Sequence, residues 1–105
     1  MPQTLSASDS GSKITLDSGE LFEIVLRENP TTGYRWHVTI VPPTIIASEG
    51  DDLSSPSKAP GSGGERHFRF RAAQAGAFEL ECLRYREWES ASSATETFKL
   101  SGVVR

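Results

Sequence analysis

Cysteine and long apolar runs are both nearly missing from this sequence of 105 residues. Its single cysteine, Cys82, excludes an internal disulfide and any cysteine-based metal cluster. Because Cys82 follows Phe78 and Leu80 in period-2 alternation, we expect its thiol to be a buried, unreactive core group. No apolar stretch approaches the roughly 20 residues that a membrane-spanning helix needs, so no membrane partner is predicted.

Charge of one sign is not concentrated anywhere in the chain either. Fourteen acidic and eleven basic residues give a net charge of -3, and the Lys and Arg residues are scattered. A nucleic-acid partner is not expected, since phosphate binding needs a basic patch. The segment from Met1 to Gly11 lacks the basic start and apolar centre of a secretory signal. As written, the chain is expected in the cytoplasm, and a processed N-terminus would make it periplasmic or secreted.

What the sequence does contain is alternation of apolar and polar residues, interrupted by turn residues about every ten positions, with little helical spacing. About seven strands are predicted, and they indicate an all-β, immunoglobulin-like antiparallel β-sandwich. We expect one monomeric domain over 12–105, preceded by a flexible segment over 1–11. The predicted strands span 12–16, 20–27, 34–41, 44–48, 65–72, 76–86 and 95–104.

Strands that alternate in direction send every second connection to the same end of a sandwich. The second, fourth and sixth connections should therefore cluster, and the opposite ones are short turns. Binding residues concentrate on loops held by a rigid scaffold, so the clustered end is the predicted working end. The first part of the Ser-, Gly- and Asp-rich stretch over 49–64 is expected to be a mobile loop. The clustered segments are Asn29-Pro30-Thr31-Thr32-Gly33, Gly61-Ser62-Gly63-Gly64 and Arg86-Glu87-Trp88.

An organised catalytic group is hard to find. The two histidines, His37 and His67, fall on polar-facing strand positions and are expected at the solvated surface. Cys82 faces inward, and no Gly-x-Ser-x-Gly elbow is present to hold a nucleophilic serine. Glu79 and Glu81 have no metal-ligand spacing with the histidines. The sequence favours a protein without enzyme activity, metal or cofactor, although counting residues does not exclude a Ser-His-Asp set.

Each clustered segment has an ordinary interpretation and a functional one. Asn29-Pro30 restricts the entry to a turn and Gly33 permits a positive φ at its exit, which suits a tight turn or a rigid binding loop. The glycines over 61–64 indicate flexibility or close approach of a partner to the backbone. Trp88 is either an exposed interface anchor or a ring folded over the edge of the sandwich.

Taken in order, the three segments resemble the chagasin-type inhibitors of papain-like cysteine proteases. That family has an Asn-Pro-Thr-Thr-Gly-aromatic loop, a Gly-x-Gly-Gly loop and an Arg-Pro-aromatic loop. The similarity covers most of the chain after about residue 12, but Glu87 stands where the family has proline. The resemblance implies that the protease-binding residues are Asn29, Pro30, Thr31, Thr32, Gly33, Tyr34, Gly61, Ser62, Gly63, Gly64, Arg86 and Trp88.

An inhibitor of this kind is reversible and non-covalent, and its three loops fill the active-site cleft. The resemblance therefore implies papain-like cysteine proteases as partners, and no cofactor. Fold alone does not separate this function from an immunoglobulin-like adhesion or carbohydrate-binding module that uses the same loops, which stays the alternative. A small hydrolase is a third hypothesis and would need an exposed nucleophile.

Overall fold

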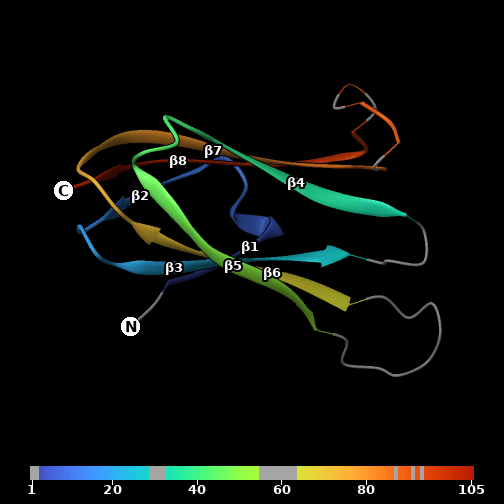
Figure 1. Cartoon of the computed structure of the whole chain (residues 1–105), viewed down its shortest axis with the longest axis horizontal. Coiled ribbons are helices and arrows are strands. Elements are labelled where there is room, and N and C mark those ends of the chain that lie inside the picture. Colours follow the sequence, from blue (N-terminus) through green and yellow to red (C-terminus); the bar gives the residue numbers. More distant parts are fainter. Residues whose placement is uncertain (1–2, 29–32, 55–63, 87, 91, 93) are drawn as a thin grey trace.

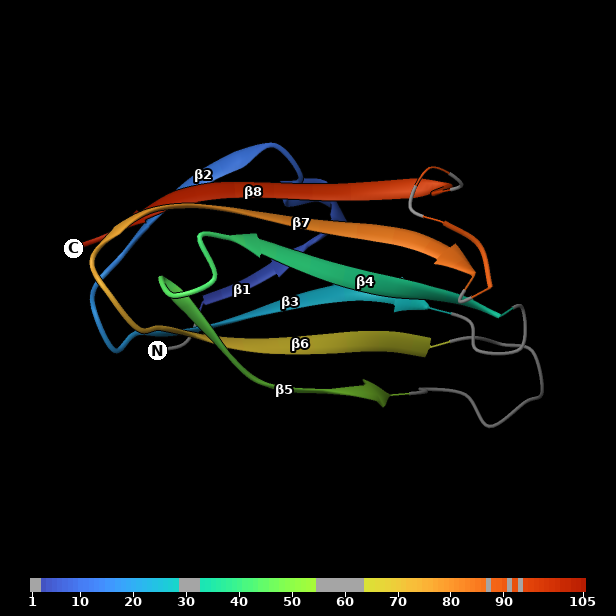
Figure 2. The ribbon, with the colours of Figure 1, turned by 45° about the horizontal axis from the view of Figure 1, so that its top comes forward.

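The structure, a computed structural model, describes residues 3–28, 33–54, 64–86, 88–90, 92 and 94–105. Its strands form two four-stranded sheets that face each other (Figures 1 and 2), which confirms the predicted all-β sandwich. No helix within these ranges is long and apolar enough to cross a membrane. The elements are β1 (Gln3–Ser6), a 3-10 helix η1 (Ala7–Asp9), β2 (Ser12–Leu16), β3 (Leu21–Glu28), β4 (Tyr34–Val41), β5 (Ile46–Ser54), β6 (Gly64–Ala72), β7 (Gly76–Arg86) and β8 (Glu96–Val104).

Both sheets are mixed, which corrects the prediction of antiparallel pairing throughout. The strand orders are β1-β3-β6-β5 and β2-β8-β7-β4. β1 runs parallel to β3 and β2 runs parallel to β8, while the other pairs are antiparallel. Both parallel strands are short edge strands from the start of the chain. Neither is joined to its partner by a tight hairpin, so no turn imposes antiparallel pairing on them.

The N-terminal part contains a strand that the sequence did not predict. β1 lies within the segment over 1–11 that was expected to be flexible, and it pairs with β3 from Gln3 to Ser6. Its Leu5 side chain is buried in the core. One apolar residue in a four-residue strand produces no alternation to detect, which explains why the sequence predicted about seven strands and the described part of the chain forms eight.

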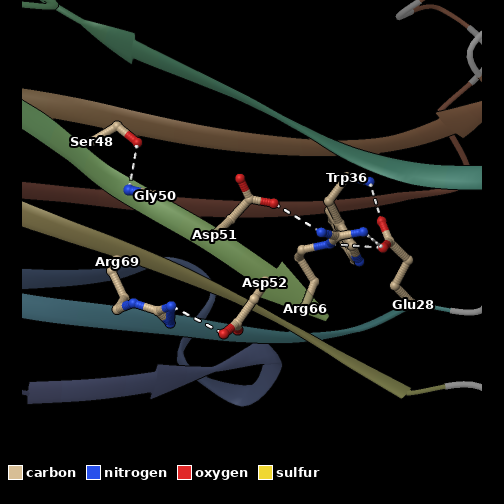
Figure 3. Close-up of polar contacts among 8 residues, drawn as sticks. All are labelled: Glu28, Trp36, Ser48, Gly50, Asp51, Asp52, Arg66 and Arg69. Atoms are coloured by element: carbon tan, nitrogen blue, oxygen red, sulfur yellow. Dashed lines mark hydrogen bonds and ion pairs between the residues drawn. The ribbon is translucent and has the colours of Figure 1, made fainter. Parts of the chain in front are cut away.

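β5 is longer than predicted, because a strand was expected only over 44–48 and a mobile loop after it. The strand continues to Ser54 and pairs with β6, with a bulge beside Gly50, whose φ is +107°. Its second half is mostly polar because β5 is an edge strand of its sheet. Asp51 and Asp52 each accept a hydrogen bond from an arginine of β6, at 2.9 and 3.0 Å (Figure 3).

The core lies between the sheets and follows the predicted alternation. β3 buries Phe22, Ile24 and Leu26, and β7 in the facing sheet buries Phe78, Leu80 and Cys82, so the predicted inward position of Cys82 is confirmed. Gly102 of β8 leaves room for the Phe78 ring, since a Cβ there would lie 2.9 Å from two ring atoms. This packing holds the strands rigidly along the sandwich and fixes where their ends lie.

Candidate functional site

The ends of three strands and the starts of three others meet at one end of the sandwich. β3, β5 and β7 finish there, and β4, β6 and β8 begin there (Figure 1). The turns over 17–20, 42–45 and 73–75 lie at the opposite end, beside the C-terminus (Figure 2). The strand directions therefore bring together the strand ends that border the three segments of the predicted working end (Figure 1).

The structure describes five of the predicted binding residues, namely Gly33, Tyr34, Gly64, Arg86 and Trp88. They come from all three segments. The remaining predicted binding residues lie outside the described residues, as does Glu87, and their predicted roles stay predictions: Asn29, Pro30, Thr31, Thr32, Gly61, Ser62 and Gly63.

Tyr34, at the start of β4, lies near two arginines of the neighbouring strand β7. It pairs with Arg86 in the register of β4 and β7. The Arg86 guanidinium carbon lies 4.6 Å from the centroid of the Tyr34 ring, and that of Arg84 lies 5.2 Å from it. Arg86 also lies 5.7 Å from the centroid of the Trp88 ring. Such contacts place a cation over an aromatic face, so Arg86 connects the first segment to the third.

The Trp88 indole is 73% exposed, yet it is not free of the protein surface. It lies against Gly33, where an added Cβ would be 2.8 Å from the Cη2 atom of the ring. Gly33 also has a φ of +81°, a conformation that favours glycine. The ring therefore folds against the backbone at Gly33 and still presents most of its surface to solvent, and its role as an interface anchor stays a prediction.

A four-residue turn carries Trp88. The Glu89 N–H donates to the Arg86 carbonyl at 2.9 Å, which is the bond that closes a β-turn. Further along, the Thr95 N–H donates to the Arg84 carbonyl at 2.9 Å and leads the chain into β8. The backbone on both sides of the third segment is thus tied to the end of β7.

Gly64 opens β6 directly opposite Glu28, the last residue of β3. The predicted strand ended at residue 27, and the structure corrects this, because Glu28 still belongs to β3 and is only 3% exposed. Glu28 accepts hydrogen bonds from Arg66, whose Nη2 and Nε atoms lie 2.6 and 2.8 Å from Oε2 (Figure 3). The pair lies directly beneath the ends of the first two segments.

Sequence reasoning missed Glu28 and Arg66, although their positions carried a signal. Glu28 continues the inward-facing series of β3 after Leu26, and Arg66 precedes the inward-facing Phe68 and Phe70 of β6. Two opposite charges in phase with two buried faces indicate a buried ion pair. Burial opposes the charge on Arg66, but the hydrogen bonds and charges of Glu28, and then of Asp51, raise its pKa.

Cys82, His37 and His67 are the side chains that were considered for catalysis. Cys82 is fully buried, and this burial, followed by the charge of Glu81, raises the pKa of its thiol to about 12. The histidines are half-buried and not simply solvated, which corrects the prediction: the His37 ring stacks on Tyr85 with centroids 3.9 Å apart, and His67 Nδ1 lies 3.0 Å from Glu23. Among the described residues, no cluster of histidine, cysteine and carboxylate side chains is placed to hold a metal ion.

Trp88 presents exposed aromatic surface beside the end of β7, on a rigid β-sandwich. Proteins that bind other proteins commonly present such a surface. The sequence profile of the chagasin family of peptidase inhibitors matches residues 15–101. The chain therefore belongs to this family.

The sequence similarity to its relatives extends over almost the whole chain. It is similar to chagasin from Trypanosoma cruzi, at 31% identity over 93% of this chain and 94% of chagasin. Amoebiasin-1 from Entamoeba histolytica is 30% identical, over 93% of this chain and 97% of that protein. The crystal structure of a cysteine protease inhibitor from Entamoeba histolytica has the same fold, with a TM-score of 0.83 at 22% identity, and the match covers 98% of this chain and 94% of that one.

Proposed function

We propose that this chain inhibits papain-like cysteine proteases reversibly and without a covalent bond. Its three segments would fill the active-site cleft from the loop end, which is the end of the sandwich where β3, β5 and β7 finish. The chain belongs to a family of peptidase inhibitors and not of enzymes. The observation that carries the proposal for this particular surface is Trp88, which is 73% exposed while resting on Gly33 and near Arg86. An ordered, exposed indole is a strong interface anchor.

The proposed mechanism follows from the chemistry of the target. A papain-like site holds a thiolate beside an imidazolium and cleaves a peptide whose carbonyl lies in line with the sulfur. An inhibitor has to cover this pair without presenting such a carbonyl. Proline at position 30 restricts one side of the first segment, and Gly33 turns the chain with φ +81° on the other. Thr31 and Thr32 between them are the residues proposed to face the catalytic pair.

The other two segments would bind the walls of the cleft. The glycines at 61, 63 and 64 lack side chains, so a protease surface can approach the backbone closely and pair with its amide groups. Trp88, with Arg86 and Tyr34 behind it, would pack on apolar residues of the opposite wall. Rigid binding loops in general lose little entropy on binding, which is how protease–inhibitor interfaces of roughly 1,600 Å² become very tight.

Titration of papain with the purified protein tests the proposal. We expect competitive, reversible inhibition, and mass spectrometry after long incubation should show the inhibitor uncut. Cleavage between Asn29 and Tyr34 with loss of inhibition would contradict the non-substrate mechanism. No inhibition at micromolar concentration would favour the adhesion or carbohydrate-binding alternative, and turnover of a generic ester would revive the hydrolase hypothesis.

A further inference from the structure

The inward positions of a β-sandwich normally carry apolar side chains. In this sandwich, the inward positions at the loop end carry two charged side chains. Glu28 follows Phe22, Ile24 and Leu26 on the inward face of β3 and is as buried as they are. Arg66 occupies the matching inward position on β6, opposite Leu26, and its side chain is only 16% exposed. A carboxylate at such a depth has to be paired and hydrogen-bonded.

The hydrogen bonds of this pair join four strands. Glu28 Oε2 accepts from two nitrogens of Arg66, whose Nη1 donates to Asp51 of β5 at 2.9 Å. Glu28 Oε1 accepts from the backbone N–H of Trp36 at 3.1 Å, and the Trp36 indole N–H donates to the Arg27 carbonyl at 2.8 Å. Because β4 belongs to the facing sheet, these bonds set the distance between the sheets at this end (Figure 3).

Stability alone is a weak reason for such an arrangement. The desolvation of two buried charges consumes most of their attraction, and well-packed apolar replacements of similar size are often as stable or more stable. What an apolar pair does not supply is direction. A guanidinium fork on a carboxylate, with the second carboxylate oxygen on a backbone amide, defines one separation and one orientation of the strands.

The place of the pair suits a role in binding. Glu28 is the last residue of β3 and lies opposite Gly64, the first residue of β6. It therefore lies where the first segment follows β3 and where the second segment leads into β6. Trp36 lies two residues beyond Tyr34, and Tyr34 supports Arg86 and hence the third segment. The hydrogen bonds of the Glu28–Arg66 pair therefore constrain the strand ends that border all three segments.

We propose that Glu28 and Arg66 are positioning residues for inhibition: their buried ion pair sets the spacing of the strand ends that present the binding segments. This inference rests on the proposed function. Neither residue needs to touch the protease, since the pair acts through Trp36 and the strand ends.

The first test is the double variant Glu28→Gln/Arg66→Met. It removes both charges together, so no unpaired charge is left buried, and Gln keeps an oxygen for the Trp36 N–H. Arg69→Met is the matched control, because Arg69 is an arginine of the same strand with an exposed carboxylate partner, Asp52. We expect the double variant to melt within a few degrees of the wild type yet bind papain at least about tenfold more weakly, and the control to bind as the wild type does. A folded double variant whose Kd stays within about twofold of wild type overturns the proposal.

A second test needs no protease, and it also covers a double variant that fails to fold. Glu28→Gln alone leaves Arg66 paired with Asp51. Amide hydrogen exchange, followed by NMR in the free protein, should become at least about threefold faster at Gly33, Tyr34 and Gly64 and stay unchanged in β2 and β8. Unchanged exchange at the first three amides overturns the positioning role. Absence of inhibition by the wild type would instead refute the proposed function, and the exchange result would still judge the ion pair.

Discussion

Trp88 is mostly exposed and yet lies against neighbouring residues at the same end of the sandwich. Its ring is mostly solvent-accessible, and among the described residues it lies against the Gly33 backbone and near the Arg86 side chain. Since these neighbours belong to the loop end and not to the core, removal of the indole should leave the sandwich intact.

We therefore expect Trp88→Ala to weaken inhibition by about 2 kcal/mol or more, roughly 30-fold in Ki, with little change in melting temperature. Inhibition assays and thermal unfolding of the same preparation measure both quantities. Trp36→Ala is the control, because Trp36 is 8% exposed and its loss should destabilise the fold by about 3–5 kcal/mol. A drop of many degrees for Trp88→Ala would show that its ring supports the core.

Alanine variants of Gly33 and Gly19 can separate the effect of backbone strain from the effect of the position of the Trp88 ring. Its φ of +81° resembles the +90° of Gly19, which lies in a turn at the opposite end of the molecule. An added Cβ at Gly19 meets no atom within 4 Å, whereas one at Gly33 would collide with the movable end of the Trp88 ring.

Gly33→Ala and Gly19→Ala should accordingly lose similar stability, about 1–2 kcal/mol each from the left-handed backbone conformation. Only Gly33→Ala should lose inhibition, by about tenfold or more, because the ring has to leave its position. Denaturant unfolding and Ki determination of both variants check this. Equal inhibition by the two variants would mean that the contact between Gly33 and Trp88 does not matter for binding.

At the scale of elements, the strand ends decide how the binding segments are presented. The bond from the Glu89 N–H to the Arg86 carbonyl, of the kind that closes a β-turn, is 2.9 Å long, and Glu87, next after Arg86 in the sequence, lies outside the described residues. Proline is favoured at the second position of such turns, since its ring presets φ near −65°. Glutamate at this position leaves the unfolded chain more conformational freedom and adds a charge beside Trp88.

Glu87→Pro is expected to tighten binding to papain by a few-fold to about tenfold, chiefly through slower dissociation. Surface plasmon resonance at several salt concentrations provides the rates. If wild-type binding weakens as salt rises and the proline variant binds worse, then Glu87 pairs with a basic group of that protease. In that case the glutamate confers specificity and the entropy argument is wrong for this target.

The elements with a regular series of apolar residues could be predicted from the sequence, including β2 and β4 at their observed bounds, whereas the more polar ones could not. β3, β6, β7 and β8 were located within a residue or two, because each buries a regular series of apolar side chains. β1 and the second half of β5 were missed. Both are edge strands with few apolar residues, so their pairing with the neighbouring strand, and not their own pattern, makes them strands.

For the whole molecule, Cys82 reports on folding. Its folded-state pKa is about 12, and its ordinary value is 9.0. The unfolded chain therefore loses the thiol proton at lower pH than the folded chain does. The stability that this difference represents is complete below pH 9 and disappears as the pH rises toward 12.

Between pH 8 and pH 10, the free energy of unfolding should fall by about 1 kcal/mol through Cys82 alone. Cys82→Ala is the control, because it lacks this contribution while every other group titrates as before. Denaturant titrations of both proteins at the two pH values measure the difference. An equal fall in wild type and variant would show that the thiol is not protected by folding.

The sequence by itself determined the class of fold, the inward faces of the main strands, the burial of Cys82 and the three segments of the loop end. These depend on period-2 geometry and turn residues, which act over a few neighbouring positions. Only the tertiary structure decided which strands pair in parallel, that Trp88 covers Gly33, and that Glu28 meets Arg66, 38 residues away. The local pattern places a charge on a buried face, but its partner depends on which strands become neighbours, and that is settled by packing of the whole chain.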